Sequence, residues 1–282
     1  MQLAEGRRLG AAFWVLTFAC CYSKDERKLK TLDNRDRMAG LAKRYKRAVK
    51  RVSMAWRTGL IEHSPQWMRR IFGPATIYLD MMLIDHGFFR VFYLNKHALA
   101  ADAWRSAQPA PHNLRRFKRD GMKTILNLRG ERKCGSYWLE EKWCRRLGLK
   151  LVNFQVRSRA APEIDEFRRI KALFESIEYP MLMHCKSGAD RAGLMSVLYR
   201  HFREGMPIEQ ARDELSLRYG HIRQANTGIL DFVFDRYVAE NAERPVTFMD
   251  WVETRYDPQE VTEAFKSNSW ADRFVGTVLQ RE

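Results

Sequence analysis

The chain is poor in cysteine and proline, and it has no long hydrophobic run. Its five cysteines, in 282 residues, are odd in number and irregularly spaced, which argues against the disulfide framework of a small secreted domain. Nine prolines and 16 glycines are too few for a collagen-like or low-complexity chain. The longest apolar run, Leu9 to Tyr22, falls short of the roughly twenty residues that span a bilayer. These absences predict a globular protein in a reducing compartment, and we expect a cytoplasmic location.

The apolar run near the N-terminus has two interpretations. It is either a targeting segment or a packed part of the mature protein. Bulky Phe18 directly before Ala19 and Cys20 makes a poor cleavage site, which favours the second interpretation. Whether residues 1–22 belong to the mature protein stays open.

Acidic residues are scarce relative to basic ones. The chain has 50 Lys and Arg residues but only 34 Asp and Glu residues, which gives a formal net charge of +16. Residues 1–70 hold 17 of the basic and six of the acidic side chains, whereas residues 101–282 are nearly balanced, with 31 and 26. Such an excess favours an anionic partner, such as phosphate, nucleic acid or a membrane surface, but it does not indicate a fold.

The basic N-terminal part has the pattern of an amphipathic helix. Apolar side chains recur every three or four residues from Met38 to Trp56, and lysines and arginines fill positions between them. This helix either packs on the body of the protein or binds an anionic membrane surface through residues 23–58, while nucleic acid is the less favoured partner. We expect three parts along the chain: a basic extension (1–70), an apolar helical linker (71–100) and a folded domain with C-terminal helices (101–282).

Charged side chains interrupt the linker, which is otherwise rich in Phe, Met, Ile and Tyr. Asp80, Asp85 and Arg90 would be costly in the hydrocarbon core of a bilayer. We therefore expect a helix that faces the protein core or the edge of a membrane, and not a membrane span.

From residue 101 onwards, short β-rich runs alternate with helical stretches. This alternation predicts an α/β fold with a mainly parallel central sheet flanked by helices, between a helical N-terminal extension and a helical C-terminal segment. The expected strands are Trp104–Gln108, Lys123–Arg129, Lys150–Val156 and Met181–His184. The expected helices are Pro111–Arg119, Trp138–Leu147, Pro162–Ile177, Arg191–Gly205, Pro207–Tyr219, Gly228–Val238 and Phe248–Phe265.

The segment His184–Gly193 (HCKSGADRAG) lies between a buried strand and the start of a helix. Small residues at 187–189 allow a concave loop whose N–H groups point inward, and the helix adds its positive end. Cys185 lies at the floor of this loop, where the N–H dipoles favour a thiolate nucleophile. The planar guanidinium of Arg191 can hold two phosphoryl oxygens. The pattern predicts a site that binds phosphate and attacks it through sulfur.

Cys-x5-Arg, preceded by His184 and an apolar strand, resembles the signature of the cysteine-dependent protein tyrosine and dual-specificity phosphatases. Trp104–Pro109 (WRSAQP) and Lys123–Arg129 (KTILNLR) also resemble the opening of the atypical dual-specificity branch found in bacteria, fungi and plants. The resemblance covers roughly residues 101–240. It implies a tyrosine-phosphatase-like fold and hydrolysis of phosphomonoesters through a phosphocysteine intermediate, with no metal and no cofactor.

The resemblance also assigns roles to the residues of the loop. It makes Cys185 the nucleophile, Arg191 the phosphoryl-binding residue and His184 a group that tunes the thiolate by hydrogen bonding. A zinc site that includes Cys134 and Cys144 is not expected, because the cysteines form no closely spaced pair. The other residues expected to bind the substrate are Lys186, Ser187, Gly188 and Ala189.

The sequence departs from the family pattern at two positions. The loop after the strand that ends near Val156, where the family usually has its general-acid Asp, reads RSRAAP and holds no carboxylate. The acid is therefore expected at Asp190, or else at Glu163 or Asp165. Asp190 resembles the Gly-Lys-Asp-Arg arrangement of some bacterial tyrosine and lipid phosphatases, although it could instead orient the loop. Most members have Ser or Thr where this chain has Ala192.

The substrate class has three interpretations. A phosphoprotein is the first expectation. Positive charge around the pocket would be added by Arg157, Arg159 and Lys186. It favours an inositol phosphate or an anionic phospholipid as the substrate. The enzyme would then act as a peripheral protein on the inner face of a membrane. A non-catalytic phosphate-binding module is the third interpretation, because the usual acid is missing, but the retained Cys185 thiol argues against it.

Overall fold

The computed structural model of the chain describes residues 75, 77–85 and 87–267. The apolar run Leu9 to Tyr22 and the basic stretch Met38 to Trp56 lie outside the described residues, so both expectations stay predictions. Among the described helices, none is both long enough and apolar enough to cross a bilayer.

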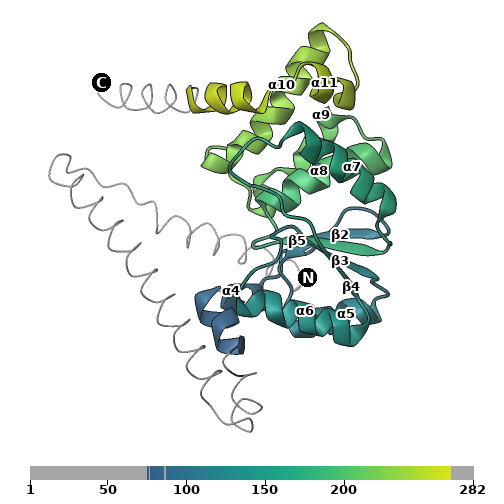
Figure 1. Ribbon diagram of the computed structural model, residues 1–282, viewed down its shortest axis with the longest axis vertical. Coiled ribbons are helices and arrows are strands. Elements are labelled where there is room, and N and C mark those ends of the chain that lie inside the picture. The colour runs from purple at the N-terminus through teal and green to yellow at the C-terminus, as the bar shows by residue number, and fades with distance from the viewer. Residues whose placement is uncertain (1–74, 76, 86, 268–282) are drawn as a thin grey trace, which may run out of the picture. The chain divides into compact units, whose positions relative to one another are not determined.

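A five-stranded sheet, in the order β1-β2-β5-β3-β4, organises the body of the protein (Figure 1). Strands β2, β5, β3 and β4 are parallel, and the short β1 pairs antiparallel with β2 at one edge. The expected α/β fold with a mainly parallel sheet is confirmed. The sequence does not predict β1, because two residues carry no periodic pattern. The strands are β1 (His97–Ala98), β2 (Ala103–Ala107), β3 (Thr124–Asn127), β4 (Lys150–Asn153) and β5 (Met181–Cys185).

Helices cover both faces of the sheet. Helices α5 and α6 lie against one face, and α7 and α8 lie against the other, with α9, α10 and α11 beyond them (Figure 1). The helices are α5 (Pro111–Arg119), α6 (Gly135–Leu147), α7 (Ile164–Ser176), α8 (Asp190–Glu204), α9 (Ile208–Ala211), α10 (Ile229–Glu243) and α11 (Phe248–Thr254).

The strands send alternate side chains into two hydrophobic cores. In β5, Met181, Met183 and Cys185 belong to the larger core, which residues of α7, α8, α10 and α11 complete. Leu182 belongs to the smaller core with residues of α5 and α6. All five residues of β5 are buried, and β2 and β3 pair with its two edges. The strand that ends in Cys185 is therefore enclosed on every side.

The expected helix Pro207–Tyr219 is wrong as a single element. Helix α9 is followed by two short 3-10 turns, Arg212–Glu214 and Leu217–Tyr219. The backbone leaves the helical region at Leu215, where φ is −96° and ψ is 76°. This break turns Glu214 inward, and its carboxylate meets the side chain of Arg105 in β2.

The expected helix Phe248–Phe265 is also divided. Helix α11 ends at Thr254, and residues 258–267 form a second helix. The side chain of Asp257 accepts hydrogen bonds from the backbone N–H groups of Gln259 and Glu260, at 2.7 and 3.2 Å. Asp257 thus caps a new helix whose first position is Pro258, a residue that needs no N–H donor there.

The described part of the linker is helical up to Phe92, and strand β1 (His97–Ala98) follows, so the expectation of a helical segment is wrong for its C-terminal end. Asp80, Asp85 and Arg90 are each no more than 7% exposed. Large apolar side chains of the same segment, Leu79, Phe88 and Phe92, are exposed. The core-facing and membrane-edge alternatives both stay predictions. The helical elements of this segment include a π-helical turn (Asp80–Ile84) and α4 (Gly87–Phe92).

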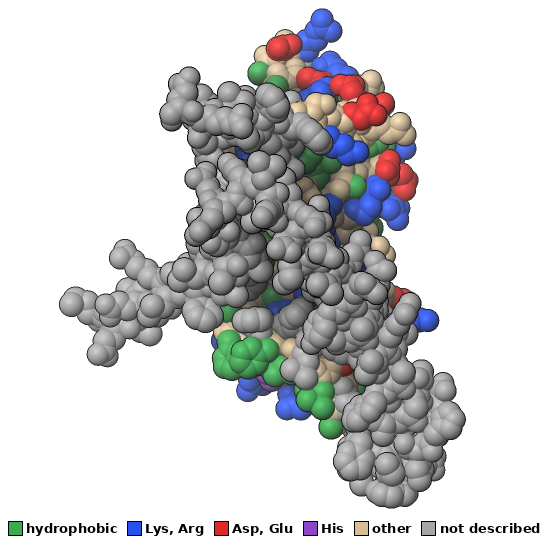
Figure 2. Space-filling model, turned by 90° about the vertical axis from the view of Figure 1, so that its left-hand side faces the viewer, with side chains coloured by type: hydrophobic (Ala, Val, Ile, Leu, Met, Phe, Trp, Pro, Cys, Tyr) green, Lys and Arg blue, Asp and Glu red, His purple; other side chains and the backbone are tan. Residues whose placement is uncertain are grey.

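Acidic and basic side chains are interspersed over the C-terminal helices, in the upper part of Figure 2. Ion pairs such as Arg236–Glu260 and Arg168–Glu253, both at 2.9 Å, join neighbouring elements there. Exposed pairs of this kind add little stability. Their balance agrees with the near equality of charges that the sequence shows over residues 101–282.

Candidate active site

The turn from β5 to α8 forms the centre of the site. Cys185 is the last residue of β5, Asp190 is the first residue of α8, and residues 186–189 form the loop between them. Gly188 has a φ of +77°, and a Cβ there would lie 2.7 Å from the backbone nitrogen of Ala107 in β2. Only glycine fits this position, both for its backbone conformation and for its close approach to the neighbouring strand.

Cys185 lies at the floor of this loop, as the sequence predicts. Its side chain is buried, and its sulfur accepts a hydrogen bond from the backbone N–H of Gly188 at 3.2 Å. The N-terminus of α8, a helix of 15 residues, begins five positions later. The partial positive charge of a helix N-terminus favours an anion beside it.

The carbonyl groups of the loop are bonded on the side away from Cys185. The side-chain amide of Asn95 donates to Ser187 O at 3.0 Å. The guanidinium of Arg105 donates to Gly188 O at 2.8 Å and to Ala189 O at 3.0 Å.

Arg105 is completely buried beneath the loop. Besides the two loop carbonyls, it donates to the backbone oxygen of Glu214 at 2.7 Å and to its carboxylate at 3.0 Å. The Tyr219 ring lies over the guanidinium, at 4.1 Å from its centroid. Burial lowers the pKa of Arg105, and interactions with Glu214 and Cys185 oppose the change. A cation is therefore fixed within electrostatic reach of the candidate nucleophile.

Arg191 is partly buried at the start of α8. Burial lowers its pKa, with Cys185 opposing and the guanidinium groups of Arg129 and Arg132 adding to the decrease. The guanidinium of Arg191 makes no hydrogen bond or ion pair with the side chain or backbone of another described residue, so its donors are free to bind an anion. Charges of three arginines therefore act on one place beside Cys185.

The sequence analysis missed Arg129 and Arg132. Both follow β3, which pairs with β5 in parallel, so both strands end at the same edge of the sheet. Ligands of open α/β sheets bind at this carboxyl edge. The available signal was the pair of basic residues at the end of the expected strand Lys123–Arg129 and just beyond it. Arg129 is 5% exposed and donates to the side chain of Gln108.

His184 faces the opposite side of the sheet from Cys185. Its Nε2 lies 2.7 Å from a carboxylate oxygen of Glu140 in α6, and both side chains are fully buried. The amide of Gln108 donates to the other Glu140 oxygen at 2.9 Å. The Nδ1 atom of His184 is 3.4 Å from the backbone oxygen of Cys185, and no hydrogen bond joins the side chains of His184 and Cys185. The structure thus places His184 behind the nucleophile, and not against its sulfur.

The carboxylate of Asp190 is held by a buried histidine. His221 Nδ1 lies 2.8 Å from Asp190, and its Nε2 lies 2.6 Å from Asp231. Burial alone would lower the pKa of His221, but the hydrogen bonds to the two carboxylates raise it to about 9. At neutral pH His221 is therefore an imidazolium between two carboxylates, and Asp190 forms an ion pair.

The other candidate acids lie in exposed ion pairs. Glu163 pairs with Arg157 at 2.7 Å, and Asp165 pairs with Arg169 at 3.0 Å. Arg159 is exposed. None of these residues has a hydrogen bond or ion pair to the described residues of the loop, so their roles stay predictions.

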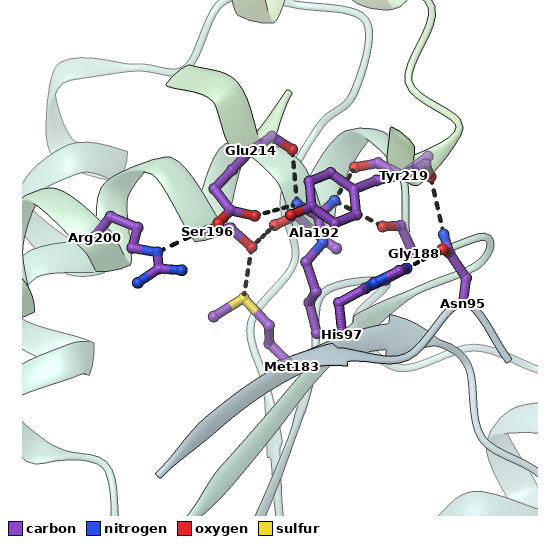
Figure 3. Close-up of polar contacts among 11 residues, drawn as sticks. Asn95, His97, Met183, Gly188, Ala192, Ser196, Arg200, Glu214 and Tyr219 are labelled. Carbon is purple, nitrogen blue, oxygen red and sulfur yellow. Dashed lines mark hydrogen bonds and ion pairs between the residues drawn. The ribbon is translucent and has the colours of Figure 1, made fainter. Parts of the chain in front are cut away.

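Ala192 is buried in the first turn of α8. Its backbone oxygen accepts a hydrogen bond from Ser196 Oγ at 2.6 Å (Figure 3). Along the helix, the nearest hydroxyl is that of Ser196, and it is bonded to the backbone. It lies one turn after position 192, where most members of the resembled family have Ser or Thr.

Comparison with known proteins gives one family and several solved structures. The profile of a family described as DSP-PTPase phosphatase fused to NAD+ kinase matches residues 93–228. No curated protein matches the chain. TpbA of P. aeruginosa is 18% identical, over 56% of this chain and 88% of its own, with a TM-score of 0.42. Tk-PTP in its active form is 20% identical, over 54% and 99% (TM-score 0.41), and PTPMT1 is 15% identical, over 53% and 99% (TM-score 0.39).

Proposed function

Because residues 93–228 belong to the cysteine-dependent dual-specificity phosphatases, we propose that this enzyme hydrolyses phosphomonoesters through a phosphocysteine formed on Cys185. The observation that carries the proposal is the arrangement around its sulfur. The N–H of Gly188 points at Sγ, α8 begins beside it, and Arg191 has donors that no described residue occupies. An anionic phosphoryl group fits such a place.

The reaction has two steps. In the first, the Cys185 thiolate attacks phosphorus, an S–P bond forms, the ester P–O bond breaks, and the leaving alkoxide takes up a proton. Arg191 and the loop N–H groups hold the non-bridging oxygens throughout. In the second step, water attacks phosphorus, the S–P bond breaks, and inorganic phosphate and the thiolate are released.

The role of Asp190 follows from its partner. The Asp190 carboxylate is engaged by the buried His221 ring, which fixes its orientation. We therefore assign Asp190 to positioning the start of α8 through His221, at 2.8 Å. This is the alternative role that the sequence analysis gave it, and the proton donor is then another group or water.

Replacement of Cys185 by Ser tests the mechanism. The variant should lose turnover of an aryl phosphate but still bind vanadate, since the loop donors are backbone groups. Cys144→Ala is the matched control. Cys144 is also buried, but burial raises its pKa well above the usual range, so it stays a neutral thiol and its loss should leave activity intact. Undiminished hydrolysis by the Cys185→Ser protein would exclude the phosphocysteine step.

A phosphoprotein is the first proposed substrate, and an inositol phosphate or anionic phospholipid is the second. The second proposed substrate rests on two observations. The charges of Arg129 and Arg132 interact with Arg191, and Lys186 in the loop is partly exposed. Several positive charges around one phosphate site favour a substrate with further anionic groups. Residues 1–70, with 17 basic side chains, would then bring the enzyme to an anionic membrane.

One turnover screen separates these proposals. Phosphotyrosine peptides, soluble inositol phosphates and phosphorylated lipids in vesicles are compared at equal ionic strength. A preference of kcat/KM for the peptides supports the first substrate, and a preference for either of the others supports the second. A chain that binds phosphate but turns over none of them would be a non-catalytic phosphate-binding module.

A further inference from the structure

The block WRSAQP contains a residue that none of the catalytic roles explains. Arg105 points from the middle of β2 toward the underside of the loop, and it is fully buried. A buried cation is costly unless it is paired, and a buried ion pair is a weak source of stability. Its four hydrogen bonds with the chain divide equally between Glu214 and the loop carbonyls. The second pair of bonds points to a role in the loop.

The loop bonds determine where its N–H groups point. A peptide unit is planar and trans, so its N–H lies opposite to its C=O. The carbonyls of residues 187–189 are bonded by Asn95 and Arg105, and Lys186 O faces the backbone N–H of Gln108 at 3.5 Å. The following N–H groups, of residues 187–190, are thereby directed toward the opposite side. The hydrogen bond from Gly188 N–H to the Cys185 sulfur agrees with this direction.

Asn95 has a backbone that suits its place. Its φ is +50°, a left-handed conformation that asparagine tolerates better than other residues with a side chain. Its amide also donates to the backbone oxygen of Tyr219 at 2.9 Å. The Tyr219 ring covers the guanidinium of Arg105, so the side chains of Asn95 and Arg105 both contact Tyr219. They form one unit with the loop.

We propose that Arg105 and Asn95 are positioning residues of the phosphate-binding loop. Their side chains hold the carbonyls of Ser187, Gly188 and Ala189 away from the pocket, which keeps the N–H groups facing the phosphoryl group. The proposal rests on the phosphatase function proposed above. It extends the site to two residues that touch neither substrate nor sulfur.

Two variants test the role of Arg105 and Asn95 without changing a residue of the loop itself. Arg105→Lys keeps the charge but cannot reach two carbonyls and a carboxylate with a planar fork. Asn95→Gly removes the amide and keeps a backbone that adopts positive φ freely. Orthovanadate affinity, measured by calorimetry on the full chain, reports on the loop without turnover. We expect a loss of about tenfold or more for Arg105→Lys and a smaller loss for Asn95→Gly, with kcat/KM for an aryl phosphate falling in parallel.

A core substitution away from the loop separates this role from general stability. Val252→Ala removes buried methyl groups in α11 and should lower Tm without weakening vanadate binding. Wild-type vanadate affinity in a folded Arg105→Lys protein would overturn the proposal, as would an equal loss in Val252→Ala. If Arg105→Lys does not fold, unchanged affinity in Asn95→Gly overturns it. Vanadate binding without any turnover by the wild-type chain would instead contradict the proposed phosphatase function.

Discussion

The buried imidazolium of His221, between Asp190 and Asp231, predicts a contribution to the free energy of unfolding whose magnitude follows from the structure. We consider the change His221→Gln, which removes the titrating ring and keeps a side chain of similar size. The pKa of His221 rises from 6.5 to about 9 in the folded protein. The His221 side chain is completely buried, and its two partners lie at 2.8 and 2.6 Å; Asp231 is 8% exposed, whereas Asp190 is 28% exposed and is partly screened by solvent.

The sign of the effect follows from proton linkage. A group whose pKa is raised by folding stabilises the folded state fully below its unfolded pKa of 6.5, and it loses this contribution as the pH rises through about 9. The full contribution is about 3.4 kcal/mol, since one pKa unit is about 1.4 kcal/mol. By the same relation, about 2 kcal/mol remains at pH 7.5 and only a few tenths of a kcal/mol at pH 9.5.

Chemical denaturation of both proteins over a range of pH measures this contribution. The difference in the free energy of unfolding between wild type and His221→Gln should shrink by about 2 kcal/mol from pH 7.5 to 9.5. His201→Gln is the matched control, because burial lowers the pKa of His201 and its ring stays neutral over this range. A difference for His221→Gln that is constant with pH, as in the control, would refute the assignment of an imidazolium at this position.

Three further predictions concern catalysis and the membrane. Asp190→Asn should slow phosphotyrosine and an aryl phosphate with an activated leaving group by the same factor, whereas selective slowing of phosphotyrosine by ~10²-fold or more would make Asp190 the general acid. Rapid mixing should show a burst of about one equivalent in the wild type, because Ala192 offers no hydroxyl to the departing sulfur, and Ala192→Ser should raise the steady rate but not the burst. Absence of a burst would show that another step is limiting. The full chain should sediment with anionic liposomes, less so as salt rises, and removal of residues 1–60 should abolish this; a chain that ignores anionic liposomes at low salt would exclude membrane binding.

The sequence predicted the elements whose patterns are local. The expected helix Pro111–Arg119 agrees with α5 to the residue, and the four parallel strands lie within a residue or two at their starts. Proline, glycine and short apolar runs mark these boundaries directly. The loop after β5 was found for the same reason, since its cysteine, small residues and arginine are contiguous in the chain.

What the sequence could not show are contacts between distant segments. Asp190 and His221 are 31 positions apart, and Arg105 and Glu214 are 109 apart. Neither periodicity nor composition indicates which charges a fold will pair. The identity of these partners bears on the roles: the ion pair with His221 is the reason why we propose Asp190 as a positioning residue and not as the acid. The break of the expected helix at Leu215 has the same origin, because the inward turn of Glu214 serves a contact with β2.

The central place of β5 has a consequence for how the site can respond to its surroundings. Its amides are bonded within a strand that is paired on both edges and covered on both faces, so they should exchange with deuterium only when the whole domain unfolds. We therefore expect Cys185 to share the lifetime of the native state, without local opening of its strand. We expect control of this enzyme to act on access to the loop and on recruitment, and not on the strand beneath the thiol.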